Sequence, residues 1–265
     1  MKKAPVLISV PHGGAKTPKE LLPYTNMNEE DRYLDGDAHT TEIYNFSESV
    51  LETHMASVAR CYIDLNRKAD DLPPNNHDGV LKTVNLYGKP IYKDQWFPDK
   101  ELIAILLKKY YHPYHNALLQ AEKRGIELAI DCHSMLPYAP DFGEENDLFE
   151  HRPEICLGNL GDENGDPLEG KKTSCSKELL DEFTKGLQKS FFNEDIRVSM
   201  NHPFKGGYIT QFHGTSSALP WIQLEINRSL YMEKNYCNPL SNRTKESRIN
   251  DLNQKIKDAV LYLFS

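Results

Sequence analysis

The chain has 265 residues and a formal net charge of −8 at neutral pH, an acidic balance that argues against a nucleic acid or an anionic membrane as partner. Its hydrophobic content of 39% and charged content of 26% are typical of a globular protein. No stretch approaches the roughly 20 apolar residues that a transmembrane helix needs. The five cysteines lack Cys-x-x-Cys spacing, so we predict neither a disulfide framework nor a thiolate zinc site.

The amino-terminal segment does not have the pattern of a secretory signal. The apolar run before His12 is too short for the hydrophobic region of such a signal, and no small-residue cleavage site follows it. We therefore expect a cytoplasmic protein. No internal repeat or boundary divides the chain, so a single catalytic domain over residues 1–265 is predicted.

Short apolar runs alternate with amphipathic helical patterns along the whole chain. This alternation predicts an α/β fold in which a mainly parallel or mixed sheet is flanked by helices. Strands are predicted at residues 6–10, 58–65, 126–130, 154–158, 197–200 and 220–226. Helices are predicted at residues 40–55, from Asp99 to Arg124 with a kink at Pro113, after a cap at Ser174 or Ser176, and at residues 249–263.

Two segments show no periodicity. Residues 68–98 contain the Pro73-Pro74 pair and form an irregular excursion, which is either a plain surface loop or a functional lid. Residues 137–150 are acidic and irregular.

Polar groups follow several of the predicted strands. His12 comes after the first strand, Asn66 and Arg67 after the second, and His133 after the strand that ends at Ile130. In open α/β sheets ligands bind beyond the carboxyl ends of the strands. Several such ends in one chain indicate a catalytic site.

The histidines and aspartates at these ends are candidate metal ligands. His12 and His133 lie at strand ends, and Asp37 and His39 lie between them in the sequence. Three ligands drawn from histidine and carboxylate, with one position open, are typical of catalytic zinc. The sequence contains no compact metal motif, and a structural role for each histidine is the alternative.

Glu225 lies within an apolar strand, where an unpaired carboxylate is costly to bury. It is a candidate general base with a raised pKa, or else the partner of Arg228 or Lys205 in an ion pair. Arg67 offers a planar fork that could hold a substrate carboxylate, or could form a structural salt bridge.

A serine or cysteine nucleophile is disfavoured. Cys132, His133 and Ser134 are adjacent on a strand and point to alternate faces, and the chain has no Gly-x-Ser-x-Gly motif. The pair Gly206-Gly207 indicates close approach of the backbone to another group.

Taken together, these motifs resemble the N-formylglutamate amidohydrolases, a family similar to the zinc carboxypeptidases and aspartoacylase. The resemblance covers residues 6 to about 232. It is carried by Ser9–Gly14, Asp37, Ile63–Arg67, Asp131–Met135, Asn201–Thr210 and Leu224–Met232.

The resemblance implies a carboxypeptidase-like α/β protein with one Zn²⁺ per chain. It assigns the two zinc histidines to His12 and His133 and the catalytic glutamate to Glu225. Carboxypeptidases take their middle ligand three residues after the first histidine, where this chain has Ala15, so we expect Asp37 to replace it, with His39 in reserve. Substrate binding is expected from Asn66, Arg67, Lys205, Gly206 and Gly207.

The expected activity is hydrolysis of the N-acyl amide of an acidic amino acid such as N-formylglutamate. A small acidic N-acyl amino acid is thus the expected partner. The alternatives are a binding protein for acidic metabolites that lacks catalysis, and a carboxypeptidase-like peptidase or amidase. A binding protein would need Arg67 but would have no use for a base at Glu225.

Overall fold

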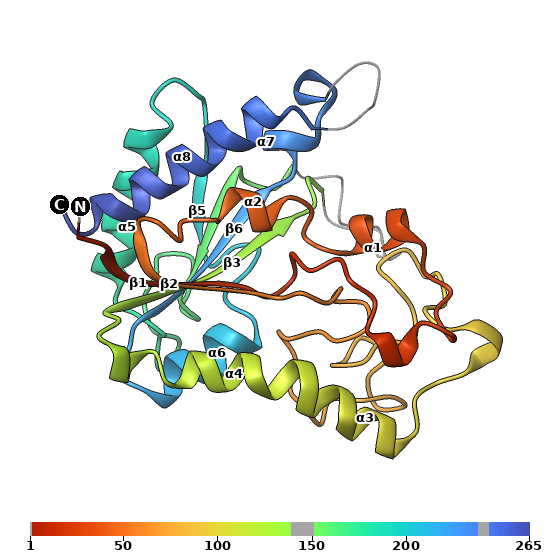
Figure 1. Cartoon of the computed structure of the whole chain (residues 1–265). Helices are drawn as coiled ribbons and strands as arrows, with labels where there is room; N and C mark the ends of the chain where they lie inside the picture. The colour runs from red at the N-terminus through yellow and green to blue at the C-terminus, as the bar shows by residue number, and fades with distance from the viewer. Residues whose placement is uncertain (1, 139–150, 238–243) are drawn as a thin grey trace.

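A six-stranded mixed sheet forms the centre of the molecule (Figure 1). The computed structural model describes residues 2–138, 151–237 and 244–265, so the predicted acidic segment at 137–150 lies largely outside the described residues. The strands are β1 (Ala4–Val10), β2 (Val50–Met55), β3 (Leu128–Met135), β4 (Ile155–Gly158), β5 (Val198–Met200) and β6 (Trp221–Asn227).

The strand order in the sheet is β2-β1-β3-β6-β4-β5. The strands β2, β1, β3 and β6 are parallel neighbours, whereas β4 runs antiparallel to β6 and parallel to β5. The carboxyl ends of β1, β3 and β6 therefore meet at the same edge of the sheet. The predicted α/β class and mixed sheet are confirmed.

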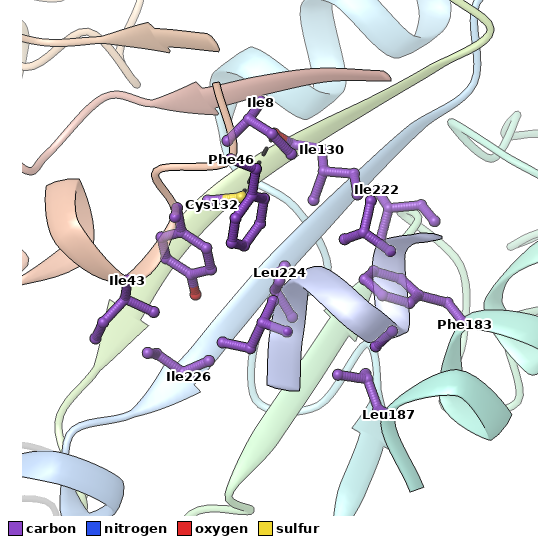
Figure 2. Packing of buried hydrophobic residues seen from close by; sticks show 14 of the residues in the cluster. Ile8, Ile43, Phe46, Ile130, Cys132, Phe183, Leu187, Ile222, Leu224 and Ile226 are labelled. Atoms are coloured by element: carbon purple, nitrogen blue, oxygen red, sulfur yellow. Dashed lines mark hydrogen bonds between the residues drawn. The ribbon is translucent and has the colours of Figure 1, made fainter. Parts of the chain in front are cut away.

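Alternation along the central strands places apolar side chains on both faces of the sheet. One face packs Ile8, Ile130 and Leu224 against Phe183 and Leu187 of α5 (Figure 2). On the opposite face, Leu7, Ala129 and Trp221 of the strands pack against the helices α3, α4 and α6. On that second face, the carboxyl ends of the strands carry polar residues instead of apolar ones.

The helices cover both faces of the sheet (Figure 1). One layer contains α2, α5 and α8, and the other contains α3, α4 and α6. The α-helices are α1 (Glu29–Asp35), α2 (Thr40–Ile43), α3 (Lys100–Leu106), α4 (His112–Leu119), α5 (Lys177–Ser190), α6 (Tyr208–Ser216), α7 (Ser229–Met232) and α8 (Glu246–Tyr262). Shorter helical segments are the 3-10 turns Lys19–Leu21, Lys93–Gln95, Glu122–Arg124 and Lys234–Tyr236 and the π-helical turn Leu107–Tyr111.

Helix starts follow the predicted caps. Asp99 accepts the Leu102 amide at 2.9 Å at the start of α3, and Ser176 accepts the Leu179 amide at the start of α5. The division expected near Pro113 is present as the π-helical turn that joins α3 to α4, which lies directly before the position where the proline has no N–H to donate.

Two predicted elements are wrong. The helix expected over residues 40–55 ends at Ile43, and its second half is the strand β2, which pairs in parallel with β1. The strand expected over residues 58–65 is a series of turns, in which the amides of Tyr62 and Ile63 both bond the carbonyl of Ala59. Its apolar side chains are buried as expected, but because β2 already occupies the edge beside β1, they pack under the sheet instead of extending it.

The excursion at residues 68–98 is irregular, as predicted, and is fastened to the body of the protein by backbone hydrogen bonds. The amide of Asp64 bonds the carbonyl of Val80 at 2.8 Å, and the amide of Asn26 bonds the carbonyl of Ile91 at 2.8 Å. Within the described residues, we find no helix with the length and apolar character needed to span a bilayer.

Candidate active site

The site is built on the polar half of one sheet face. On β3, Ile130 and Cys132 point into the apolar core, so Asp131 and His133 point to the other face. On β6, Glu225 lies directly opposite His133 in the parallel register. Strand pairing alone therefore brings a histidine and a buried carboxylate next to each other.

His12, Asp37 and His133 converge at this edge of the sheet. Each side chain is at most 5% exposed, and one ligand atom from each lies within 4.8 Å of the others. Asp37 Oδ2 is 3.6 Å from His12 Nδ1 and 3.3 Å from His133 Nδ1, and the two Nδ1 atoms are 3.2 Å apart. The structure thus brings together the three predicted metal ligands.

The second nitrogen of each histidine is committed to a carboxylate. His12 Nε2 lies 2.7 Å from Asp64 Oδ1, and His133 Nε2 lies 3.0 Å from Asp131 Oδ2. An N–H donated from Nε2 leaves the Nδ1 atom of a neutral ring with a lone pair. Two such lone pairs and the Asp37 carboxylate face one another, so the arrangement favours a cation between them. Carboxylates that orient metal-binding histidines in this way are common in metal sites.

The pKa shifts of Asp37 and His133 also favour a positive charge among these side chains. Burial works against ionisation of Asp37, but hydrogen bonds and charge from His12 and His133 outweigh it and hold the pKa of Asp37 well below its usual range. Burial also opposes protonation of His133, yet Asp131 and Asp37 raise the pKa of that ring well above its usual range. Positive charge is therefore stabilised among these side chains, whether a proton or a metal ion supplies it.

Asp37 is held from several sides. Its Oδ2 accepts the Ser134 amide at 3.1 Å, and its Oδ1 lies 3.4 Å from Arg228 Nη2 and 3.8 Å from Arg60 Nη1. Arg228 also donates to the carbonyl of Gly36 at 2.6 Å, which fixes the turn before Asp37. The position of this carboxylate is therefore set before any ion binds.

His39, the reserve ligand, lies outside this group. Its Nε2 is 3.0 Å from the Tyr33 hydroxyl, and its Nδ1 is 3.8 Å from Glu42. Of the two expected alternatives, the structure brings Asp37 and not His39 to the histidine pair.

A cleft of about 280 Å³ opens beside the three converging ligands. All of the residues that sequence analysis assigned to the site line this cleft, namely His12, Asp37, Asn66, Arg67, His133, Lys205, Gly206, Gly207 and Glu225.

Glu225 is only 7% exposed and has no ion-pair partner in the described part of the chain. Arg228, one of its expected partners, pairs with Asp37 instead. Burial, strengthened by the nearby charges of Asp37 and Asp131 and opposed by His133, raises the pKa of Glu225 to about 7. Its hydrogen bond comes from Gln223 Nε2 at 3.1 Å. A buried carboxyl of this kind can both accept and donate a proton near neutral pH.

Asn66 and Gly207 form the close contact that the glycine pair indicated. A Cβ atom on Gly207 would lie only 2.1 Å from Asn66 Nδ2. Asn66 Oδ1 accepts the Ile209 amide at 2.7 Å, and the Gly207 amide donates to Gln223 Oε1 at 2.5 Å. The amide of Gly207 is thus directed to Gln223, which in turn bonds Glu225, so the glycine turn supports the Glu225 carboxyl.

Arg67 and Lys205 supply positive charge at the cleft. Arg67 is anchored by Asp78, with Nη2 to Oδ2 at 2.6 Å, and its backbone carbonyl accepts the Tyr111 hydroxyl at 2.7 Å. Lys205 is exposed and forms no salt bridge with any described residue.

Several residues of the site were assigned no role by sequence analysis. Asp131 was noted only as part of the motif Asp131–Met135, although its spacing of two positions from His133 on a strand puts both side chains on one face. Asp64 was noted only as part of a strand end. Arg60 and the buried Lys82, which lie 3.3 Å and 3.1 Å from Asp64 Oδ2, gave no signal, because turns and the excursion bring them to the site.

Comparisons with known proteins bear on the fold and the family of the chain. A search among curated proteins finds no match. A solved structure of N-formylglutamate amidohydrolase from Ralstonia eutropha JMP134 superposes with a TM-score of 0.73 at 21% identity, covering 100% of this chain and 93% of that chain. A gene product from Agrobacterium tumefaciens gives 0.62 at 14% identity, covering 97% and 90%. These two likenesses support the fold.

The family model described as N-formylglutamate amidohydrolase matches residues 4–232. That span contains every residue assigned to the cleft, as well as the carboxylates behind the two histidines. The chain belongs to the N-formylglutamate amidohydrolase family.

Proposed function

We propose that the protein is a zinc-dependent amidohydrolase that removes the acyl group from the nitrogen of an acidic amino acid such as N-formylglutamate. Family membership supports hydrolysis of an amide bond. The observation that carries the finer proposal is the convergence of His12, Asp37 and His133 beside Glu225, a buried carboxyl with a pKa of about 7.

The donor set fits zinc. His12, Asp37 and His133 would hold the ion, which is a combination of two histidines and one carboxylate that leaves a position open for water or substrate. Asp64 and Asp131 keep both imidazoles in the tautomer that zinc binding requires. Bound zinc supplies Lewis-acid chemistry, polarising a carbonyl oxygen and lowering the pKa of a water molecule.

Glu225 is the general base and then the general acid in this proposal. It accepts a proton as the water oxygen forms its bond to the acyl carbon, and it returns that proton to the amine nitrogen as the C–N bond breaks. Formate and the free amino acid are the products when the acyl group is formyl. A protein that only bound acidic metabolites would have no use for a buried, unpaired carboxyl at this place, so Glu225 favours the enzyme over that alternative.

The cations of the cleft determine which substrates bind. Arg67 holds one carboxylate of the amino acid, and Lys205 binds the second carboxylate of an acidic side chain; both residues line the cleft, which supports these roles. Asn66 supports the same wall through its bond to the Ile209 amide. Arg60, which lines the cleft 3.8 Å from Asp37, provides positive charge next to the carbonyl being attacked.

Metal analysis and formate release, measured on the same samples, test the proposal. Wild type should contain one zinc per chain and release formate from N-formylglutamate, and His133→Ala should lose both properties. The matched control is His39→Ala, which removes a histidine near the site but outside the ligand group. Full zinc occupancy in His133→Ala would contradict the ligand assignment. Loss of zinc in His39→Ala, with zinc retained in His133→Ala, would also contradict it.

A further inference from the structure

The excursion at residues 68–98 brings an ion pair, Asp78 with Lys82, into contact with Arg67. Arg67 donates from Nε to the carbonyl of Asp78 at 2.8 Å and from Nη2 to Asp78 Oδ2 at 2.6 Å. The other carboxylate oxygen of Asp78 is bonded by the ammonium of Lys82. Lys82 is only 2% exposed, so a buried cation holds the carboxylate that holds Arg67.

Asp78 binds only one of the two edges of the Arg67 guanidinium. A guanidinium has a side edge, formed by Nε and Nη2, and an end edge, formed by Nη1 and Nη2, and each can bind a carboxylate in two parallel hydrogen bonds. Asp78 occupies the side edge. Arg67 has no further side-chain partner among the residues that the structure describes, and it lines the cleft. A ligand carboxylate can therefore bind the end edge without displacing Asp78.

The same ion pair is connected to the metal ligands. Lys82 Nζ lies 3.1 Å from Asp64 Oδ2, and Asp64 Oδ1 bonds His12 Nε2 at 2.7 Å. The contacts thus run from Arg67 through Asp78, Lys82 and Asp64 to His12. This chain of charges fixes the carboxylate-binding arginine relative to the centre where the amide is cleaved.

We propose that Asp78 is a positioning residue that presents the end edge of Arg67 to the substrate carboxylate. Arg67 is ordered before the substrate arrives, so binding does not have to restrict a long flexible side chain. Asp78 therefore determines the affinity for substrates with a free carboxylate and leaves the bond-breaking step unchanged. This inference rests on the proposed function, because it takes the carboxylate of the N-acyl amino acid as the ligand of Arg67.

The test compares Asp78→Asn with a matched control in the full-length, zinc-loaded protein. The control is Asp166→Asn, which removes the charge of another exposed aspartate in a salt bridge, with Lys177 Nζ at 2.8 Å. For N-formylglutamate, Asp78→Asn should raise KM by about tenfold, the loss expected when a charge-assisted contact is weakened, with kcat changed less than twofold. Asp78→Glu, which keeps the charge, should recover part of the loss, and the control should match wild type.

Two outcomes would overturn the inference. An unchanged KM in Asp78→Asn means that Arg67 does not depend on Asp78, and a lower KM means that Asp78 competes with the substrate. A double-mutant cycle adds a readout that a general structural role would not produce. In an Arg67→Lys background, Asp78→Asn should have little further effect on KM, whereas additive losses would contradict the positioning role.

Failure of the proposed function can be recognised separately. If zinc-loaded wild type does not hydrolyse N-formylglutamate, the proposed function fails, and the same variants are then compared by the calorimetric Kd of L-glutamate. The inference expects weaker glutamate binding in Asp78→Asn than in wild type and Asp166→Asn. Equal Kd values, or no binding to wild type, would overturn it.

Discussion

Replacement of Glu225 by glutamine should lower kcat by about 10²–10⁴-fold, which is the range that a positioned general base contributes. The substitution is nearly isosteric, and the new side-chain oxygen can accept the hydrogen bond that Gln223 Nε2 now donates at 3.1 Å. Zinc content and KM should therefore change little. The effect would be confined to proton transfer.

The pH dependence of the wild-type enzyme adds a second readout. Burial raises the pKa of Glu225 from 4.5 to about 7. A base must be deprotonated to act, so kcat/KM should fall as the pH drops below the pKa of Glu225 in the zinc-loaded enzyme, to about a tenth of its plateau one pH unit below that midpoint. A cation bound nearby lowers the pKa of a carboxyl, so in the zinc-loaded enzyme the midpoint should lie between 4.5 and about 7.

The same shift affects folding of the metal-free protein. A raised carboxyl pKa means that the folded state favours the neutral form, so this contribution to stability is fully present below pH 4.5 and is lost as the pH rises through about 7. At about 1.4 kcal/mol for each pH unit, the loss is at most about 3 kcal/mol. Glu225→Gln cannot ionise, so its urea stability relative to wild type should increase over this range.

Formate release between pH 4 and 9 provides the assay, with wild type, Glu225→Gln and the surface control Glu182→Gln, whose carboxylate pairs with Lys185. Wild type and the control should share one acid limb, and Glu225→Gln should lack it. Activity of Glu225→Gln equal to that of wild type would refute the assignment of the base. Retention of the same acid limb in a slower variant would assign that titration to another group.

Three further substitutions test the neighbouring parts of the site and the fold. Arg67→Lys keeps the charge but loses the planar fork, so KM should rise strongly. Replacing the substrate carboxylate by an amide should then reduce substrate binding more in wild type than in the variant. Equal losses of binding in both would mean that Arg67 has a structural role. Asp131→Asn should weaken zinc binding by about 10–100-fold in a chelator competition, because His133 loses its carboxylate partner; unchanged affinity would contradict that role. Leu224→Ala should lower the free energy of unfolding by about 2–5 kcal/mol in urea, since Leu224 is fully buried on the face away from the cleft; a loss below about 1 kcal/mol would contradict the packing described.

The strands that build the site could be predicted because each begins with apolar residues. The strands β1, β3 and β6 are buried on both faces, and their polar residues, such as Ser9, Asp131 and Gln223, come after the apolar start of each strand. The polar residues at the ends of these strands could then be recognised, among them His12, His133 and Glu225. The motif resemblance then favoured Asp37 over His39; no periodicity indicates Asp37, because it lies in the turn between α1 and α2.

The errors arose where tertiary contacts override local pattern. Residues 50–55 have helical spacing with residues 43 and 44, yet β1 offers them an open edge for parallel pairing. Residues 58–65 have the composition of a strand, but no free edge remains for them beside β1. Arg60 and Lys82 reach the site from irregular segments, and their position depends on ion pairs with Asp64 that a linear pattern does not encode.

Zinc-dependent cleavage of an acidic N-acyl amino acid is the central claim, and a substrate comparison with the zinc-loaded protein tests it most directly. Formate release is measured from N-formylglutamate and from N-formylglutamine, which has nearly the same shape but lacks the side-chain charge, before and after removal of zinc by a chelator. The account predicts turnover of N-formylglutamate, a much lower kcat/KM for N-formylglutamine, and loss of activity on chelation that added zinc restores. No turnover of N-formylglutamate, or undiminished turnover without zinc, would contradict it.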